Sequence, residues 1–372
     1  MENQIKNIQC NGCGAFIQDD DDSLIGYLDR RTLEKLTDNK QPILCKRCFR
    51  LLHYKEVTPL KVGAEDFLEV IKKIPSKVTI IAVTDIFDLS TEFFSLLKKF
   101  TDVDEILIVI NKIEALPRDY KIGAVVDWVR KEAIKEKINV SYIVPTSAKN
   151  KYNIDVLYQI ITQNIKYEDV YFVGNANVGK SSLINALVKS QNRNITEPAV
   201  SSLPGTTLNF LTFKNGVQTW FDTPGILLKN QSLSIFSIDD WQLILPTNQL
   251  KTIIFQLDSG QTIFIGGLAW VDFVKGQKSS FVFYFNSNIS LHRKKTNENE
   301  IFYFQHVGNI LIPPKEKLKD TDVFKYKQLK IKTNEKKDVV FPGIGWLTLP
   351  KRVEICLNLV DNLDVTIRSA IV

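Results

Sequence analysis

Long hydrophobic runs are absent from this sequence. The longest apolar stretches, such as Val78 to Val83 and Phe281 to Phe285, have the length of a strand, whereas a membrane-spanning helix needs about 20 apolar residues. The segment from Met1 to Cys10 also lacks the basic-then-apolar pattern of a signal peptide. We therefore expect a cytoplasmic protein with no membrane partner.

Cysteine is scarce, and four of the five cysteines form two CxxC pairs, Cys10/Cys13 and Cys45/Cys48. In a reducing compartment this pattern is typical of a structural zinc site with four thiolate ligands, in which no position stays open for water. Redox-active dithiols and loss of the metal are the alternatives. The fifth cysteine, Cys356, lies in an apolar segment and is expected to be a buried small hydrophobe.

Charge is unevenly distributed. The formal net charge is +6, but residues 273–352 contain 16 Lys and Arg against 7 Asp and Glu, which leaves the rest slightly acidic. The carboxy-terminal third is therefore the candidate for binding a polyanion. The alternative is a solvated basic face without a specific partner. Lys46, Arg47 and Arg50 beside the second cysteine pair either face phosphate, as in RNA-binding zinc knuckles, or only solvate that site.

No internal repeat or low-complexity linker divides the chain, but its composition and hydrophobic pattern change at two points. Residues 1–58 hold the cysteine pairs. Residues 59–248 alternate buried-type strands with helical spacing, the doubly wound α/β pattern of a mostly parallel sheet. Residues 249–372 predict a mainly-β domain with one or two helices, one of them near Glu298 to Val307. The strands expected in this last part are Lys251–Leu257, Thr262–Ile265, Ser280–Phe285, Val339–Phe341, Gly345–Leu349 and Val353–Leu359.

A glycine-rich phosphate loop of the GxxxxGK[ST] type lies between an apolar strand and a helix start. Its backbone N–H groups and the helix N-terminus favour the phosphates of a nucleotide, with Lys180 reaching the β- and γ-oxygens and Ser181 ligating magnesium. The loop and its first helical residues are Gly174, Asn175, Ala176, Asn177, Val178, Gly179, Lys180, Ser181 and Ser182.

Two further segments are expected to contact the magnesium ion and the phosphates of the nucleotide. Asp222-Thr223-Pro224-Gly225 follows a strand, which places Asp222 near the magnesium ion and the Gly225 N–H near the γ-phosphate. Thr206, in Leu203-Pro204-Gly205-Thr206-Thr207, is the expected switch threonine that completes the magnesium shell, with Thr207 as the alternative. Alone, that Pro-Gly-Thr would indicate no more than a turn.

Two boxes predict recognition of guanine. Asn111-Lys112-Ile113-Glu114 ends a strand, and its acidic residue is expected to accept from guanine N1–H and the N2 amino group, which adenine lacks. The usual residue at that position is Asp, so Glu114 keeps the charge but changes the reach. In Thr146-Ser147-Ala148-Lys149, backbone N–H groups of Ser147, Ala148 and Lys149 supply the second base contact, to guanine O6.

The order of these boxes is permuted, because both base-reading boxes precede the phosphate loop. Ile226 follows Gly225, where Ras-like enzymes keep a glutamine that orients water, so slow intrinsic hydrolysis is expected. Asn177 stands where potassium-activated GTPases ligate a monovalent cation that neutralises developing charge. The alternative for Asn177 is that it only shapes the loop.

The permuted boxes, the cysteine pairs and three carboxy-terminal motifs together resemble the YqeH family of circularly permuted GTPases over essentially the whole length. The motifs are Gly266-Gly267-Leu268-Ala269-Trp270-Val271-Asp272, Leu291-His292-Arg293 and Gly343-Ile344-Gly345-Trp346. Glu114 and Thr84 depart from the family pattern. The resemblance implies a circularly permuted P-loop GTPase domain between a zinc-knuckle module and a mainly-β domain. It also implies a role in assembly of the small ribosomal subunit, through contacts with rRNA or ribosomal proteins.

These residues are consistent with three alternative functions. The favoured one is a GTP-hydrolysing switch that uses GTP/GDP, Mg²⁺ and Zn²⁺, with K⁺ as a candidate further cofactor. The second is a zinc-dependent RNA-binding module whose nucleotide site is degenerate or regulatory, as Glu114 and Ile226 would allow. A P-loop ATPase or kinase is third, since the Asn111-Lys112 pair argues against it. The oligomeric state is not indicated by the sequence.

Overall fold

The structure, a computed structural model, falls into two compact units. The first comprises Met1–Asp85, Ser95–Ile113 and Arg130–Leu228, and the second Ile86–Phe94, Glu114–Val129 and Lys229–Val372. Within them the structure describes residues 8, 10, 17–20, 22, 26–38, 43–46, 49, 61–62, 74–100, 102–175, 178–190, 199–202, 209–223, 225–226, 240, 243–246, 248–316, 326–360 and 363–372. No helix in these ranges combines the length and the apolarity needed to cross a bilayer.

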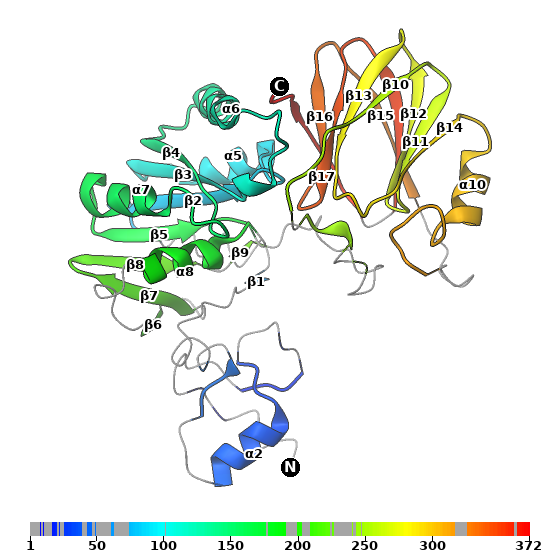
Figure 1. The fold of residues 1–372 in the computed structure, drawn as a ribbon. Coiled ribbons are helices and arrows are strands. Elements are labelled where there is room, and N and C mark those ends of the chain that lie inside the picture. Colours follow the sequence, from blue (N-terminus) through cyan, green and yellow to red (C-terminus); the bar gives the residue numbers. More distant parts are fainter. Residues whose placement is uncertain are drawn as a thin grey trace. The chain divides into compact units, whose positions relative to one another are not determined.

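A seven-stranded sheet in the order β4-β3-β2-β5-β8-β7-β6 forms the centre of the first unit (Figure 1). The first five strands of that order are parallel, and β7 and β6 continue the sheet antiparallel, so the expected mostly parallel sheet is confirmed. The strands are β2 Thr79–Asp85, β3 Glu105–Asn111, β4 Tyr142–Pro145, β5 Asp169–Val173, β6 Ala199–Ser202, β7 Asn209–Asn215 and β8 Gln218–Asp222.

Burial of the central strands explains why their apolar runs predicted them correctly. Every residue of β2 and β3 is buried, as expected for strands covered on both faces. Helices α7 (Ile154–Gln159) and α8 (Lys180–Ser190) pack on one face through Leu157, Leu183 and Leu187. The other elements in this part of the chain are α2 Arg30–Asp38, β1 Lys61–Val62, α5 Thr91–Leu97, η1 Ile113–Ala115, α6 Ile122–Lys135, η2 Ile160–Asn164 and β9 Gly225–Ile226.

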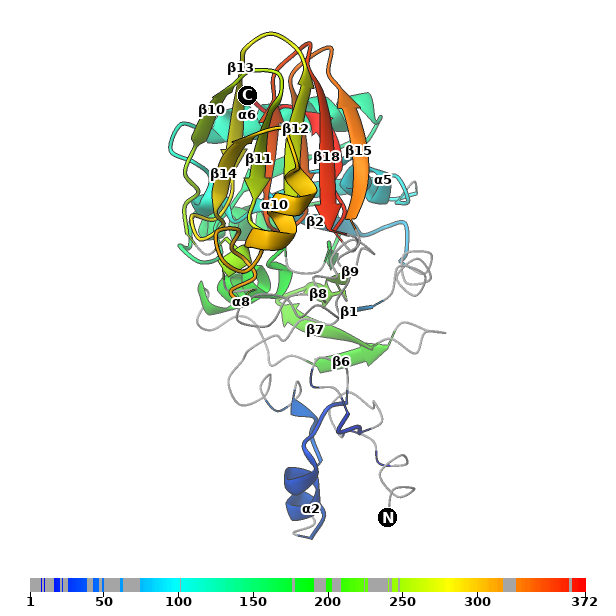
Figure 2. The same cartoon turned by 90° about the vertical axis from the view of Figure 1, so that its right-hand side faces the viewer.

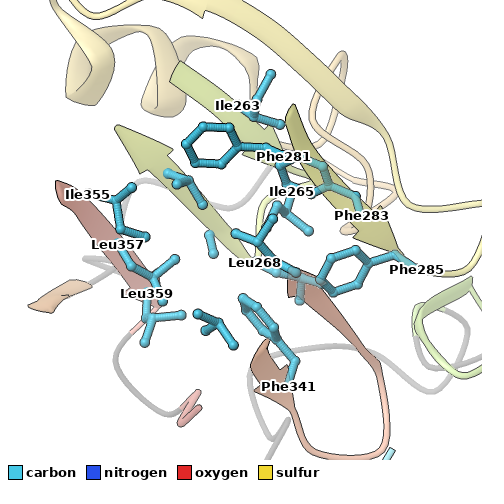
Figure 3. Packing of buried hydrophobic residues seen from close by; sticks show 14 of the residues in the cluster. Ile263, Ile265, Leu268, Phe281, Phe283, Phe285, Phe341, Ile355, Leu357 and Leu359 are labelled. Atoms are coloured by element: carbon cyan, nitrogen blue, oxygen red, sulfur yellow. The ribbon is translucent and has the colours of Figure 1, made fainter. Parts of the chain in front are cut away.

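Two five-stranded antiparallel sheets form most of the second unit, in the orders β10-β13-β17-β16-β19 and β14-β11-β12-β18-β15. Phe281, Phe283, Phe341 and Leu357 lie between them in one apolar cluster (Figure 3). Helix α10 (Asn299–His306) packs on the outer face of the second sheet (Figure 2). The strands are β10 Ile253–Leu257, β11 Gln261–Ile265, β12 Ala269–Lys275, β13 Ser279–Tyr284, β14 Leu291–Lys295, β15 Tyr326–Lys332, β16 Lys337–Phe341, β17 Gly345–Leu349, β18 Glu354–Val360 and β19 Thr366–Ser369.

Cys356 corrects one expectation. It lies in β18, but its side chain is only partly buried, because Ile355 and Leu357 on either side occupy the core. Alternation along a strand places Cys356 on the opposite face. There, partial burial and the neighbouring Asp272 carboxylate raise the pKa of its thiol. The residue is therefore a partly exposed thiol rather than a buried hydrophobe.

Candidate functional site

The phosphate loop joins the end of β5 to the start of α8, and close packing explains two of its glycines. A Cβ on Gly174 would lie 2.2 Å from the Val83 carbonyl oxygen. Gly179 has φ +85°, and a Cβ there would lie 2.4 Å from Nδ2 of Asn111. Any larger residue would therefore displace the loop from the strand ends. Two members of the predicted loop, Ala176 and Asn177, lie outside the described residues.

Lys180 and Asp222 meet in the interior. The Lys180 Nζ lies 2.5 Å from Oδ1 of Asp222, and both side chains are at least 95% buried. The same ammonium donates to the Thr223 carbonyl oxygen. Buried charges require such partners, and a phosphate oxygen is an equivalent partner for the ammonium. The pairing places the loop lysine beside the carboxylate that ends β8.

Ser181 supplies the observation that bears on magnesium. Its Oγ is buried and makes no hydrogen bond within the described part of the chain. A hydroxyl and a carboxylate such as Asp222 are the oxygen ligands that Mg²⁺ takes in nucleotide sites. The residues present therefore fit a magnesium ion. Thr206, the other predicted ligand, and Pro224 lie outside the described residues.

Asn111 connects three of the predicted boxes. At the end of β3, its Nδ2 donates to the Val178 carbonyl oxygen of the phosphate loop at 3.0 Å. Its Oδ1 accepts from the Ala148 N–H at 3.1 Å. The base-reading boxes and the phosphate loop are therefore held together by one amide side chain. The carboxyl ends of adjacent parallel strands bring these segments together, although β3 and β5 are far apart in sequence.

The neighbouring Ser147 and Lys149 complete this loop. Oγ of Ser147 accepts from the Asn150 N–H at 2.9 Å, and Ser147 forms an isolated bridge with Tyr152. These bonds fix the turn after β4, so the N–H groups that were predicted to meet a base carbonyl lie in an ordered loop. Lys149 lies in the turn that follows Ala148.

Lys112 has a partner that the sequence reasoning missed. It adopts φ +59°, and its Nζ lies 2.5 Å from Oδ2 of Asp85, which is almost fully buried. Asp85 ends β2, the strand between β3 and β5 in the sheet. An acidic residue at the end of a buried parallel strand was the available signal for it.

Glu114, the unusual member of its box, carries an unsatisfied carboxylate oxygen. It lies in η1, and its Oε2 is buried without a hydrogen-bond partner among the described residues. An unpaired buried acceptor costs about 1–3 kcal/mol. The atom is therefore available to a donor that the protein does not supply.

Gly225 is described by its backbone alone. With Ile226 it forms β9, which pairs in parallel with β1, so that Gly225 lies opposite Lys61 and Ile226 opposite Val62. The segment directly after Asp222 is thereby tied to the region that follows the cysteine pairs. The predicted role of the Gly225 N–H at the γ-phosphate stays a prediction.

Two of the four predicted zinc ligands lie together. Cys10 and Cys45 are buried, and the Cys45 N–H donates to Sγ of Cys10 at 3.2 Å. Cys13 and Cys48 lie outside the described residues, within which no group of three or more potential metal ligands occurs. A buried sulfur that accepts from a backbone N–H fits a thiolate ligand.

Comparisons with known proteins agree with these boxes. Residues 278–371 match the family model described as "YqeH-like, C-terminal", and residues 169–269 match "50S ribosome-binding GTPase". YqeH of Bacillus subtilis (strain 168) is 31% identical, covering 93% of each chain. The putative nitric oxide synthase of Oryza sativa subsp. japonica is 29% identical, over 91% of this chain and 69% of the relative. The NO-associated protein 1, chloroplastic/mitochondrial, of Arabidopsis thaliana is 28% identical, with the same coverage.

The sequence motifs, the mostly parallel sheet and the match to Bacillus subtilis YqeH along almost its full length agree. The chain therefore belongs to the YqeH family of circularly permuted GTPases.

Proposed function

We propose that this protein is a GTP-hydrolysing switch that acts in assembly of the small ribosomal subunit. The observation that carries the proposal is the position of Asn111, whose amide binds both the phosphate loop at Val178 and the base-reading loop at Ala148. This arrangement supports one nucleotide site built from boxes in permuted order. The unpaired oxygen of Glu114 supports a base that donates, as guanine does through N1–H and N2.

In the proposed site, Lys180 exchanges the Asp222 carboxylate for phosphate oxygens when the nucleotide binds. Ser181 and Asp222 would hold Mg²⁺, which when bound neutralises charge on the phosphates. Thr206 and the Gly225 N–H would respond to the γ-phosphate. Ile226 cannot orient a water, so intrinsic turnover is slow.

We also propose a monovalent cation at Asn177, which is tested by comparing the rate of GTP hydrolysis in potassium with the rate in sodium. Asn177→Ala should abolish stimulation by potassium and spare nucleotide binding.

For the amino-terminal module, residues 1–58, we propose a structural zinc site at Cys10, Cys13, Cys45 and Cys48. The contact between Cys10 and Cys45 supports it. Cys10→Ser should lose one equivalent of zinc, measured by metal analysis of the purified protein, and unfold this module alone. The control is Cys356→Ser, which should keep the metal. Retained zinc in Cys10→Ser would contradict ligation by four cysteines.

As the ribosomal partner we propose the small subunit or its precursor. The matched family model is described as a 50S ribosome-binding GTPase, whereas the motif resemblance implies the small subunit and its precursors. Gradient sedimentation of the full chain with separated small and large subunits distinguishes them. We expect binding to small subunits with a non-hydrolysable GTP analogue and release with GDP. Binding to large subunits alone, or equal binding in both states, would contradict the proposal.

The proposed division is a zinc module (1–58), a permuted GTPase domain (59–248) and an RNA- or protein-binding domain (249–372), in a cytoplasmic protein. If no saturable GTP binding occurs, the second candidate replaces the first. That candidate is a zinc-dependent RNA-binding module with a degenerate nucleotide site, and the carboxylate reach of Glu114 is what favours it.

A further inference from the structure

One end of the paired antiparallel sheets carries a groove of about 1200 Å³ within the second unit. Three connections meet there: β12 to β13, β15 to β16, and β17 to β18. Each connection crosses from one sheet to the other. Residues from three separate parts of the sequence therefore share one rim. We name this feature the cationic groove after its lining residues Lys275, Lys332, Lys336, Lys351 and Arg352.

The rim of the cationic groove is fixed by hydrogen bonds. Thr333 is buried, and its Oγ1 donates to the Pro350 carbonyl oxygen at 2.7 Å. The Thr333 N–H donates to the Val353 carbonyl oxygen at 2.9 Å, and the Arg352 N–H donates to the Thr333 carbonyl oxygen at 2.8 Å. The connection after β15 is thus tied to the connection after β17. The backbone positions that carry the cations therefore keep their spacing, which reduces the entropy lost on binding.

The charges of the cationic groove are largely uncompensated. Glu354 is the one acidic side chain that lines it, and Lys332 pairs with that carboxylate at 2.9 Å. Lys275 lies near enough to the same carboxylate to help lower the pKa of Glu354. Within the described ranges, neither Lys275 nor Lys336, Lys351 or Arg352 makes an ion pair at contact distance. These four side chains belong to exposed residues. Clustered free cations at one end of a domain raise the local concentration of a polyanion.

The uncharged lining indicates which polyanion fits. Gln277, Ser280 and Asn334 add hydrogen-bond donors of the kind that contact phosphate and sugar oxygens. The one aromatic residue of the lining, Tyr284, is buried and packs against Trp346 with ring centroids 4.7 Å apart. It is therefore not available to stack on a base, which sequence-specific readers of single-stranded RNA require.

We propose that the cationic groove binds the phosphodiester backbone of RNA without reading its sequence. The inference rests on the proposed function, because ribosomal RNA is the polyanion that such a switch meets. It adds the site, the residues and the mode of recognition. Binding governed by phosphate contacts depends steeply on salt, with a slope of about −0.7 per neutralised phosphate for a single strand.

The test uses the full chain and a fluorescein-labelled oligouridylate of about 12 nucleotides, a length that one domain can cover. The groove variant combines Lys336→Gln, Lys351→Gln and Arg352→Gln. We expect it to bind about tenfold more weakly in fluorescence anisotropy, with a salt slope smaller by about 2. An oligoadenylate of equal length should bind the parent equally well. The charge-preserving variant Lys336→Arg/Lys351→Arg should keep the affinity of the parent.

A matched control removes the same charge from the same unit outside the groove, by Lys121→Gln, Lys251→Gln and Lys315→Gln. These lysines belong to exposed residues that do not line the groove, so the control should retain most of the binding. Equal loss in both variants would show a general charge effect and overturn the inference. So would unchanged binding by the groove variant, or tighter groove-dependent binding of a labelled oligoglutamate, which would indicate an acidic protein partner.

Failure of RNA binding by the groove can be distinguished from failure of the proposed GTPase function. The groove variant should still bind guanine nucleotide and unfold at the same temperature as the parent, because its substituted side chains are exposed. In one outcome, the groove variant binds oligouridylate as the parent does, while the parent sediments with small subunits in a GTP-dependent way. This result would contradict RNA binding by the groove and would support the proposed GTPase function. If the parent never sediments with subunits, the switch fails, and anisotropy still decides the groove.

Discussion

At the scale of single residues, we expect Glu114 to decide how strictly the proposed site selects guanine. The Oε2 atom of Glu114 is buried and has no hydrogen-bond partner within the described residues. Glu114 lies three residues after Asn111, whose side chain joins the nucleotide boxes. Guanine offers two donors to such a carboxylate, adenine offers none at the same edge, and xanthine places a carbonyl where guanine has the amino group.

Glu114→Gln should therefore weaken guanine nucleotide binding by about 10- to 100-fold, since a hydrogen bond to a charged group contributes about 1.5–3 kcal/mol. The amide should also admit xanthine nucleotides, because its NH₂ can donate to the xanthine carbonyl. Displacement of a fluorescent GDP measures both effects. Glu114→Asp is the control, and it should keep guanine binding. Unchanged GDP affinity in Glu114→Gln would remove this residue from the base site.

Single residues also show what sequence alone could predict. Asn111, Ala148 and Val178 belong to short boxes that carry their chemistry in consecutive positions, so their convergence was predictable once the strands were assigned. The partnership of Lys112 with Asp85 was not, because it depends on which strand lies between β3 and β5. Nor could the unpaired oxygens of Ser181 and Glu114 be predicted, since burial of one atom is a tertiary property.

At the scale of elements, the phosphate loop keeps its shape through contact with the neighbouring strand ends. Gly179 combines a left-handed φ of +85° with a close approach to Asn111, whereas a Cβ added at Gly216, where φ is +61°, would meet open space. The two glycines separate backbone strain from steric conflict.

Gly179→Ala should reduce nucleotide affinity by more than about tenfold, because the loop must move and the left-handed backbone is disfavoured. Gly216→Ala carries the same kind of strain, of about 1–2 kcal/mol, without the clash. It should lower stability while leaving affinity unchanged. Titration with fluorescent GDP, together with thermal unfolding, measures both quantities. Equal affinities in the two variants would show that the contact with Asn111 does not matter.

Elements were predictable where burial leaves a periodic pattern. The strands expected at Gly345–Leu349 and Ser280–Phe285 correspond to β17 and β13, and the helix near Glu298 to Val307 corresponds to α10. Four strands of residues 249–372 were missed: β12, β14, β15 and β19. Of these, β14 and β15 are edge strands rich in lysine and arginine. Charge on an edge strand prevents association with other sheets, and it also hides the alternation that identifies a strand. The domain boundaries at 58 and 248 remain predictions.

At the scale of the whole molecule, each of the two units is built from segments that are separated in sequence. Ile86–Phe94, which directly follows β2, and Glu114–Val129, which begins with the last residue of the Asn111 box, belong to the unit that contains Lys229–Val372. Arg368 joins them: it pairs with buried Asp338 at 3.2 Å and donates to the Leu89 carbonyl oxygen at 2.6 Å.

Arg368→Met should destabilise this unit by about 3–5 kcal/mol, because Asp338 would keep a buried charge without its partner. The guanidinium also lies over the rings of Trp128 and Trp346, at 5.4 and 5.8 Å from their centroids. Urea unfolding followed by tryptophan fluorescence reports the change. The double variant Arg368→Met/Asp338→Leu should recover part of the loss. A decrease below about 1 kcal/mol in the single variant would show that the pair is unimportant.

Alkaline pH should weaken the same unit. Burial raises the pKa of Tyr284 to about 12, above the value of about 10 for an unfolded chain. The neutral phenol therefore stabilises the fold below pH 10, and this contribution is lost as the pH rises toward 12. Tyr284→Phe should lose less stability over that interval in thermal unfolding. The exposed control Tyr152→Phe should follow the parent, and a parent-like profile in Tyr284→Phe would contradict the assignment.

Competition binding examines whether the permuted boxes form one guanine-nucleotide site, as we propose. The full chain is loaded with a fluorescent GDP in the presence of magnesium, and GTP, ATP and XTP are titrated as competitors. We expect saturable binding that GTP displaces at least about 100-fold more effectively than ATP, since the donor pair that Glu114 meets is absent from adenine. Displacement by ATP as readily as by GTP, or no saturable binding, would contradict a guanine-specific site.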